Sequence, residues 1–351
     1  MSAQRYDAAD LRRFAGQLLA RAGLPGERAE AVADILVEAD LLGHDTHGLD
    51  MLARYLRELA EGRMATAGEP EVLQDRGSAL TWDGRRLPGP WLVRRAIDTA
   101  RERLAAHPLV SVVIRRSHHI GCLQAYLKPV ADEGLLIVLT CSDPSGAGVA
   151  PHGGVASRIT PNPLAAGFPT GGTPVLLDVS LSTTTNAMTK RLVDEGGRLP
   201  GPWLVDADGR ATDDPRALTG ERPGALLPLG GLDLGHKGFA LALVVEALTS
   251  GLAGHGRADQ PKEWGASVFL LLADPGAFGG REAFAREMGH LAALCRATPT
   301  APGRPPVRLP GEAALARRER QQREGVRLHA TTLPGLSPWA ERLGVPLPKA
   351  L

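Results

Sequence analysis

In this chain of 351 residues, the spacing of apolar residues changes near residue 76, from purely helical to a mixture of β-like and helical. This change limits the possible folds more than any other feature. Up to about residue 60 the apolar side chains recur at helical spacing, which is typical of helices packed on one face. A first helix is predicted to begin after Asp7 and end near Gly23, a second to end at Gly43, and a third to cover 49–59. The N-terminal part is therefore predicted to be helical.

Short β-like runs are frequent after residue 76, and helical segments separate several of them. Alanine and leucine dominate 238–252, which predicts a buried helix, whereas the glycines and prolines of 142–174 predict mainly loop. Pro129 interrupts a helical pattern ahead of Gly134, so that helix is expected to be short or kinked. The predicted strands are 79–82, 109–114, 135–141, 175–179 and 268–272, and further helices are predicted over 91–104, 281–295 and 312–323.

The charge balance and the cysteine content exclude several classes of protein. Forty Lys and Arg against 39 Asp and Glu give a net charge of +1, without the positive excess that nucleic-acid binding usually needs. Three separated cysteines, Cys122, Cys141 and Cys295, make no disulfide framework, which favours a reducing cytoplasm. No apolar run approaches the ~18 residues of a membrane span. We expect a globular cytoplasmic protein that binds neither nucleic acid nor membranes.

The densest polar cluster of the N-terminal part lies between two glycines, Gly43 and Gly48, and allows three interpretations. His44, Asp45 and His47 have side chains that bind divalent metals. Thr46 and His47 could instead form a hydroxyl–imidazole pair for proton transfer, because histidine titrates near ~6.5. In the third interpretation, His44 and Asp45 only cap helix ends.

A second cluster, Ser117 to Gly121, follows the strand predicted over 109–114. Ligands often bind where a strand turns into a helix, since backbone N–H groups are free there. Adjacent side chains of an extended segment point to opposite sides, so at most one of His118 and His119 is expected to face a given site. Each could equally be a packed or exposed histidine.

The glycines before Lys237 and Gly238 open the alanine- and leucine-rich helix, a pattern that suits phosphate binding at a helix N-terminus. It is not a P-loop, because Gly238 stands where that motif needs Ser or Thr. No GxGxxG follows a predicted strand, so the residues alone do not indicate a Rossmann domain.

Taken in order along the chain, these segments and several others resemble the malate/L-lactate dehydrogenase family of the non-Rossmann type, which also includes ureidoglycolate, sulfolactate and piperideine-2-carboxylate enzymes. Several ordered motifs are more specific than any one of them. The matching segments are 39–48 with Arg54 and Tyr55, 116–121, 150–154, 162–165, 177–178, Trp203 with 206–209, 226–231, 237–242 and 310–312.

The resemblance implies an α+β fold in two parts. A central, mainly antiparallel sheet domain over 76–299 would bind NAD or NADP in a non-Rossmann manner. A helical domain would form from residues 1–75 together with 300–351, which would also serve in dimerisation. The expected assembly is a homodimer.

The resemblance also implies hydride transfer between the nicotinamide and C2 of a small 2-oxo or 2-hydroxy acid, with a histidine as proton donor or acceptor. Reduction of a cyclic 2-imino acid is the first alternative. A metal-dependent hydrolase that uses His44, Asp45 and His47 is an alternative from a different class, and a catalytically inactive family member that only binds a metabolite is another.

Carried over residue by residue, the resemblance assigns proton transfer to His47 with Thr46, and places His119 at the nicotinamide end of the site. Asp178 is a further catalytic candidate, and Arg54 and Tyr55 are candidates for binding the substrate. The implied cofactor-binding residues are His119, Ile120, Gly121, Cys122, Leu123, Leu177, Asp178, Val179, Lys237, Gly238, Arg308, Pro310 and Gly311. No metal is implied.

Two positions depart from the family pattern. Many members carry an arginine that grips the substrate carboxylate four residues after the first catalytic histidine, and here that residue is Met51. Arg54 or a residue from elsewhere would have to replace it. Met188 stands where relatives often have a charged residue, so an orienting carboxylate is absent there.

Overall fold

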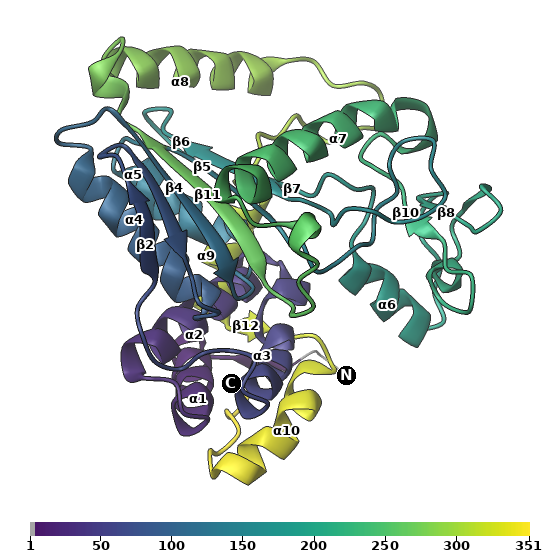
Figure 1. Cartoon of the computed structure of the whole chain (residues 1–351). Coiled ribbons are helices and arrows are strands. Elements are labelled where there is room, and N and C mark those ends of the chain that lie inside the picture. Colours follow the sequence, from purple (N-terminus) through teal and green to yellow (C-terminus); the bar gives the residue numbers. More distant parts are fainter. Residues whose placement is uncertain (1–3) are drawn as a thin grey trace.

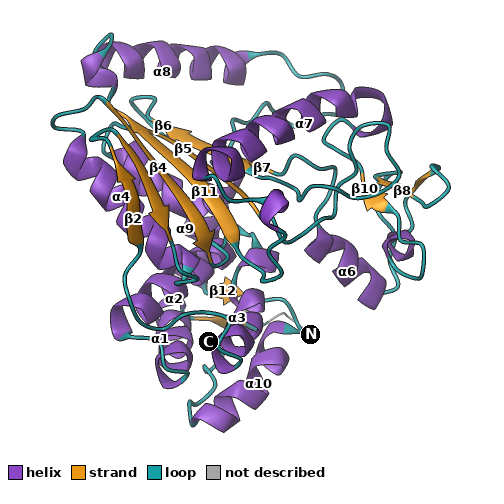
Figure 2. Ribbon diagram, in the orientation of Figure 1, coloured by secondary structure: helices purple, strands orange, loops and turns teal. Residues whose placement is uncertain are grey.

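The computed structural model describes residues 4–351 and contains a helical part, a central sheet and a smaller lateral region (Figures 1 and 2). In Figure 1 the helices near both ends of the chain lie together below the sheet, and the lateral region stands beside it. Each of the three has its own cluster of buried apolar side chains.

The helical part joins the two ends of the chain. Asp7 caps its first helix by accepting hydrogen bonds from the amides of Ala9 and Asp10, and Gly43 ends the second in the left-handed region. A short pair, β1 and β12, fastens the N-terminal segment to the C-terminal segment. The elements are β1 (Arg5–Tyr6), α1 (Ala8–Arg21), α2 (Gly26–Leu42), η1 (Asp45–His47), η2 (Leu49–Met51), α3 (Leu52–Ala60), α9 (Glu312–Glu324), β12 (Val326–Arg327) and α10 (Thr332–Leu343).

The central sheet has seven strands in the order β2-β3-β4-β11-β5-β6-β7, and every neighbouring pair is antiparallel except β3–β4. The last strand of this sheet in sequence, β11, lies between β4 and β5, so residues far apart in sequence become neighbours at its ends. The strands are β2 (Glu71–Asp75), β3 (Ala79–Asp83), β4 (Leu109–Ser117), β5 (Leu136–Ser142), β6 (Leu164–Phe168), β7 (Val175–Val179) and β11 (Ala266–Ala273).

Helices cover both faces of this sheet, which explains its nearly continuous apolar strands. The helices α4 (Gly89–Arg103) and α5 (Leu127–Asp132), with the turn η3 (Leu123–Tyr126), pack on one face. On the other face lies α7 (Gly231–Glu246), which continues as one π-helical turn, η5 (Ala247–Gly251). Helix α8 (Arg281–Ala297) follows β11 at the edge of the molecule (Figure 2).

The lateral region is small and mostly loop. Its strands β8 (Leu204–Val205), β9 (Ala211–Thr212) and β10 (Ala225–Leu226) form one three-stranded sheet beside α6 (Asn186–Asp194). Three short 3-10 turns complete the elements: η4 (Pro215–Leu218), η6 (Arg257–Asp259) and η7 (Pro275–Ala277). Within the described residues, no helix is both long and apolar enough to span a bilayer.

The predicted strands and most predicted helices are confirmed, and the helix that contains Pro129 has only six residues, as that proline implied. The prediction of a buried helix over 238–252 is wrong in two respects. The helix begins at Gly231, and Leu241, Leu243 and Val244 are 44–53% exposed. The region 142–174 is mainly loop but also contributes β6 to the sheet.

Candidate active site

His47 and His119, predicted from separate motifs, lie side by side where the helical part meets the sheet. Their ring centroids are 5.8 Å apart at an interplanar angle of 28°. His47 ends the turn η1, and His119 follows the end of β4. Both side chains are only partly buried, so a ligand can reach them.

Hydrogen bonds to Nδ1 set the protonation of His119. The backbone N–H of Gly121 donates to Nδ1 over 3.3 Å, and the hydroxyl of Tyr55 lies 2.7 Å from the same atom. Because an amide can only donate, Nδ1 must carry a lone pair, and the proton of the neutral ring is assigned to Nε2. Burial and the neighbouring His47, His118 and Arg54 hold the pKa of His119 well below its usual value.

His47 has a different neighbour at Nδ1, the hydroxyl of Thr46 at 3.1 Å. A hydroxyl donates or accepts, so this contact is compatible with either tautomer of His47. Burial lowers the pKa of His47 and outweighs the nearby carboxylates of Asp178 and Asp45, which raise it. At neutral pH the ring is therefore uncharged and able to accept a proton.

Trp264 completes a stack of three rings with His119 and His47, hereafter the ring stack. Its indole lies 4.8 Å from the His119 ring at 22°. The register of the sheet explains this contact, because β11 pairs with β4 so that Ala266 stands opposite Ser117. Sequence reasoning missed Trp264, since no local pattern in 261–265 marks it as part of a site.

Arg54 places a guanidinium over the indole of Trp264, 3.4 Å from the ring centroid. Among residues 4–351, it is the only Lys or Arg side chain that stacks on a ring of this group, and it has no carboxylate within 4.0 Å. The side chain is exposed. A cation held by an aromatic face and left without a counter-charge is available to a ligand carboxylate.

His118 precedes His119 in the chain but points to the opposite side, as expected for adjacent residues of an extended segment. There it belongs to a buried ion cluster. It is fully buried, and its Nε2 lies 3.5 Å from a carboxylate oxygen of Glu58. Arg63 binds Glu58 through two nitrogens, and Arg86 lies 4.0 Å from it. Burial lowers the pKa of His118 to about 4, so the ring is neutral in the folded protein.

Gln124 connects three of the four segments predicted to hold the cofactor. Its backbone N–H donates to Asp178, which also accepts from the thiol of Cys122 at 3.7 Å. Its side-chain amide donates to the carbonyl of Leu176, whose N–H in turn bonds the carbonyl of Pro310. Segments 119–124, 176–179 and 308–311 therefore lie alongside one another. Gln124 carried no sequence signal, because a single glutamine belongs to no motif.

Lys237 and Gly238, the fourth predicted segment, lie on α7. Gly238 packs closely against the backbone of Leu229, where a Cβ atom would approach the Leu229 carbonyl oxygen to 2.3 Å. The close packing against Leu229 explains why residue 238 is a glycine. Among the described residues, Lys237 makes no hydrogen bond or ion pair with the ring stack or with the segments joined by Gln124.

The hypothesis of a metal site formed by His44, Asp45 and His47 is wrong. Asp45 pairs with an arginine of α6, and its carboxylate does not converge with the two imidazoles. Within residues 4–351, the converging group of potential ligands is His44, Cys122 and Asp178, with atoms within 4.8 Å of one another. Hydrogen bonds already account for this group: His44 Nε2 donates to Gln124, and Asp178 accepts as described above.

Helix α6 is held over the turn that carries His47 by ion pairs. Arg191 lies 3.1 Å from Asp45 and 3.5 Å from Asp50, on either side of Thr46 and His47 in sequence. One turn earlier on α6, Met188 is 40% exposed. The lateral region thus contacts the candidate site through charged side chains.

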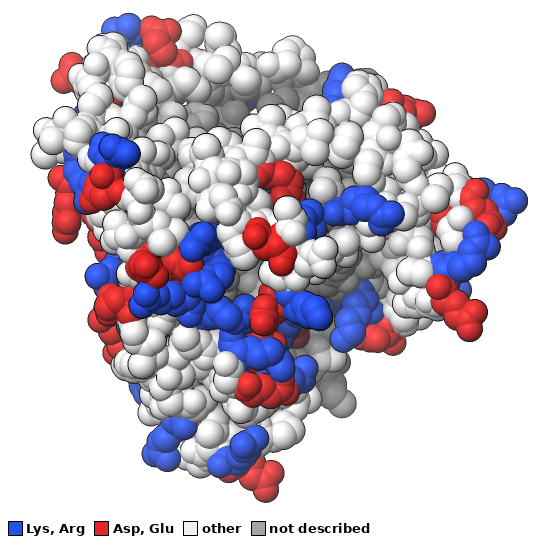
Figure 3. All heavy atoms as spheres, in the orientation of Figure 1, with Lys and Arg blue, Asp and Glu red and all other residues white. Residues whose placement is uncertain are grey.

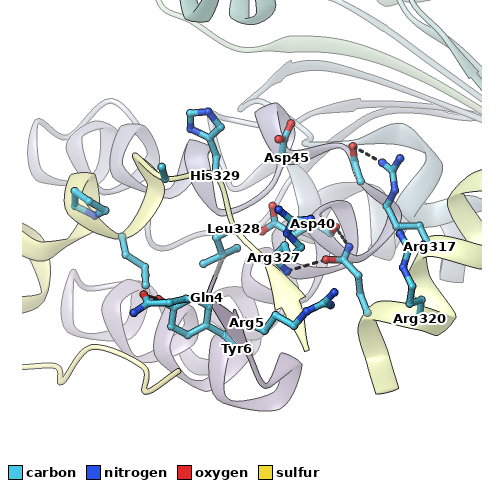
Figure 4. Close-up of a pocket in the computed structure, with 15 residues that line it drawn as sticks. Gln4, Arg5, Tyr6, Asp40, Asp45, Arg317, Arg320, Arg327, Leu328 and His329 are labelled. Carbon is cyan, nitrogen blue, oxygen red and sulfur yellow. Dashed lines mark hydrogen bonds between the residues drawn. The ribbon is translucent and has the colours of Figure 1, made fainter. Parts of the chain in front are cut away.

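A cavity of about 1030 Å³ lies beside the site and not within it. Figure 4 shows it between the N-terminal segment, η1 and the C-terminal elements, with arginines along its lining. It reaches Gly43 and Asp45 but neither His47 nor His119. We therefore base the candidate site on the histidines and their neighbours.

A family model described as malate/L-lactate dehydrogenase matches residues 6–337. The chain belongs to this family. The match confirms the resemblance seen in the ordered motifs.

Members of the family that resemble the chain along most of its length carry out related reactions. An L-lactate dehydrogenase of Cupriavidus necator is 32% identical over 97% of this chain and 98% of its own. A (2R)-3-sulfolactate dehydrogenase (NADP(+)) of Chromohalobacter salexigens is 34% identical over 85% of this chain and 87% of its own. The solved structure of delta1-piperideine-2-carboxylate reductase from Pseudomonas syringae has a TM-score of 0.83 and 26% identity, and covers 96% of this chain and all of its own.

Proposed function

We propose that the protein is an NAD(P)-dependent oxidoreductase that transfers a hydride between the nicotinamide and C2 of a small 2-oxo or 2-hydroxy acid. The observation that carries this proposal is the pair of stacked, uncharged imidazoles of His47 and His119 beside the unpaired guanidinium of Arg54. A carboxylate-bearing substrate needs a cation, and its C2 oxygen needs a group that gives or takes a proton. The family assignment supports the same chemistry.

Segments 119–123, 177–179 and 308–311 would hold the cofactor, with Lys237 and Gly238 as a further contact. Two features fit an extended ligand laid along backbone. Gly121 has a positive φ of 75°, and Gly311 has one of 94° and packs against Leu176. A side chain at either position would be strained. When bound, NAD or NADP would supply or accept the hydride, in a manner unlike a Rossmann domain.

His47 would move the proton and His119 would orient the substrate oxygen. With its Nδ1 occupied by Gly121 and Tyr55, the neutral His119 presents Nε2–H, which donates a hydrogen bond to the oxygen at C2. His47 has no such restriction, because Thr46 accepts or donates. In oxidation of a hydroxy acid His47 takes the hydroxyl proton, and in reduction it returns it. Asp178 lies close enough to His47 to favour the protonated ring, which suits that role.

The test is a spectrophotometric assay of the purified protein with NADH, NADPH and their oxidised forms. A panel of 2-oxo acids, 2-hydroxy acids and cyclic 2-imino acids is expected to give turnover with at least one compound. Calorimetry with each cofactor provides a reading that does not depend on the substrate. Absence of both turnover and cofactor binding would contradict the proposal.

Reduction of a cyclic 2-imino acid is the second candidate, and the fold shared with a piperideine-2-carboxylate reductase favours it. Such a substrate also carries one carboxylate for Arg54, and a proton is needed at nitrogen instead of oxygen. The two candidates differ in the assay: a cyclic imine reductase would consume reduced cofactor with the imine and show little oxidation of 2-hydroxy acids.

A homodimer accounts for the apolar surface of α7 and α8, which a lone chain would leave in water. Several large exposed side chains on these helices are apolar, and Figure 3 shows few charges over α7. They are Leu232, Leu234, Leu241, Leu243, Val244, Leu291 and Leu294, each 44–55% exposed. Exposed apolar side chains that cluster on a surface mark interaction sites. Analytical ultracentrifugation is expected to give twice the chain mass, and L241R with L243R should lower it.

The same proposal assigns the NAD(P)-binding role to 76–299 and a helical role to 1–75 with 300–351. The exposed apolar side chains of α7 and α8 favour these two helices for the dimer contact, in place of the C-terminal segment expected from the sequence. A cytoplasmic location agrees with three free cysteines. Fractionation of cells that express a tagged chain would test the location.

A further inference from the structure

The candidate site contains few cations that are free to bind a substrate. Among residues 4–351, Arg54 is the one that stacks on a ring of the ring stack without a carboxylate partner within 4.0 Å. Arg63 and Arg86 are committed to Glu58, and Arg191 to Asp45 and Asp50.

Carboxylates, in contrast, lie near His47 and Arg54. Asp45 and Asp178 act electrostatically on His47, and Asp143 acts on Arg54. Of these, Asp45 is neutralised by Arg191, whereas Asp178 has only hydrogen-bond donors around it. At Asp178, a second negative charge on a substrate would therefore meet a carboxylate that no Lys or Arg of residues 4–351 neutralises.

Met51, close to Arg54 in the chain, carries no charge that could balance a second negative group. It lies three residues before Arg54, so both project from the same side of the η2–α3 segment. Met51 and Trp264 are both partly buried against the apolar core of the helical part. The side of the site next to Arg54 is thus apolar where a second positive group would be needed.

Trp264 connects the two parts of the molecule at this point. It precedes β11 in the sheet, yet it packs on the helical core and lies over Arg54 and against His119. Its carbonyl accepts a hydrogen bond from Arg86 at 3.2 Å, and its ring also meets His118 edge-on at 4.9 Å. These contacts fix the distance between the cation on α3 and the imidazole after β4.

We infer that the site selects 2-hydroxy or 2-oxo monocarboxylates with an uncharged side chain, with Arg54 as the single carboxylate-binding cation and Trp264 as the residue that positions it beside His119. This inference rests on the proposed function and specifies its substrate class. Dicarboxylates and sulfonated hydroxy acids would lack a partner for their second charge. Cyclic imino acids with one carboxylate belong to the accepted class.

The first test compares kcat/KM for both enantiomers of lactate, 2-hydroxybutyrate and 2-hydroxyisocaproate with those of malate and 2-hydroxyglutarate, in the full chain with saturating cofactor. Pyrroline-2-carboxylate is included in the reductive direction. The best monocarboxylate is expected to exceed the best dicarboxylate at least tenfold. An equal or higher value for a dicarboxylate would overturn the inference and leave the proposed oxidoreductase intact. No turnover with any compound would overturn both.

Substitution of Met51 tests the charge argument within the same protein. M51R adds a second cation and is expected to raise the ratio of dicarboxylate to monocarboxylate kcat/KM at least tenfold. The matched control M51Q has similar size and no charge, and should change that ratio less than threefold. Equal ratios in M51R and M51Q would contradict the role of the missing cation.

Substitution of Trp264 tests the positioning role. W264L removes the face under Arg54 and is expected to raise KM for the preferred monocarboxylate about tenfold, with KM for the cofactor changed less than twofold. W264F keeps an aromatic face and should recover part of the loss. If W264L leaves the monocarboxylate KM unchanged, or raises the KM of substrate and cofactor together, Trp264 has no specific role.

Discussion

The adjacent residues His118 and His119 lie in two regions that differ in the partners they offer to a histidine. His118 lies in the buried ion cluster around Glu58, where every charged partner is a protein side chain. His119 lies in the ring stack, where the partners are a hydroxyl, an indole and another imidazole, and no residue in the described part of the chain hydrogen-bonds its Nε2. Burial lowers the pKa of both rings, so the pKa shift alone does not separate a structural histidine from a catalytic one.

The neighbours explain the difference. Around Glu58 the hydrogen bonds are mostly internal, and breaking them costs folding energy. In the ring stack, the guanidinium of Arg54 and the edges of the imidazoles have hydrogen-bonding groups that a ligand can use. Four changes can break or sharpen this contrast.

The largest expected effect is on catalysis. H47N removes the proton-transfer group and should lower kcat by about 10²–10⁴-fold, the usual contribution of general acid–base catalysis. The urea midpoint should change little, because His47 is partly exposed. H118Q serves as the control, with kcat within about threefold of the unmodified protein, as expected for a residue outside the chemistry. A larger loss in H118Q than in H47N would reverse our assignment of the two regions.

The ion cluster is expected to dominate stability. E58Q removes the carboxylate shared by Arg63, Arg86 and His118, and should lower the free energy of unfolding by about 3 kcal/mol, the low end for a broken buried pair because Arg63 is partly exposed. Urea denaturation followed by circular dichroism measures this. E61Q removes the exposed partner of Arg63 and is expected to cost less than about 0.5 kcal/mol. Equal losses of unfolding free energy in E58Q and E61Q would show that the buried cluster stabilises the fold no more than an exposed ion pair does.

The protonation of His118 is expected to lower the stability of the folded protein in acid. Its pKa is about 4 in the folded protein and ~6.5 when unfolded, so the unfolded chain binds the additional proton and stability falls as the pH drops below 6.5. Between pH 6.5 and 5 this histidine accounts for about 2 kcal/mol. H118Q should lose that part of the pH dependence, whereas H290Q, on the exposed surface of α8, should retain it. Unfolding curves of the unmodified protein and both variants at pH 6.5 and pH 5 measure this difference.

The smallest expected effect concerns the orientation of His119. Y55F removes the hydroxyl next to Nδ1 but leaves the Gly121 N–H in place, so kcat/KM should fall only about three- to tenfold, equivalent to roughly 1 kcal/mol. Y6F is the control and should have no effect, because the Tyr6 hydroxyl donates to the side chain of Gln4, away from the ring stack. An unchanged kcat/KM in Y55F would mean that Gly121 alone sets the tautomer.

Local patterns predicted the parts of this molecule that short-range forces decide. The cap at Asp7, the stop at Gly43 and the strand over 175–179 depend on residues a few positions apart, and all three are confirmed. The exposed apolar side of α7 contradicted a local prediction, because alanine and leucine indicate an apolar environment without saying whether the same chain provides it.

The candidate site shows the same limit. The motifs identified His47, His119, Arg54 and Tyr55, and ordering the motifs identified the family before any contact was known. The metal hypothesis failed because Asp45 pairs with Arg191, which is 146 residues away in sequence.

The sequence by itself determined the helices, the strands, the family and the two imidazoles, since each of these is encoded by residue types at short spacing. Only the tertiary structure decided which side chains surround those imidazoles. Trp264 lies on His119 because β11 enters the sheet between β4 and β5, and Gln124 joins the predicted cofactor segments because β7 runs beside η3. Both contacts arise from strand order and register, and no pattern within a few residues records them.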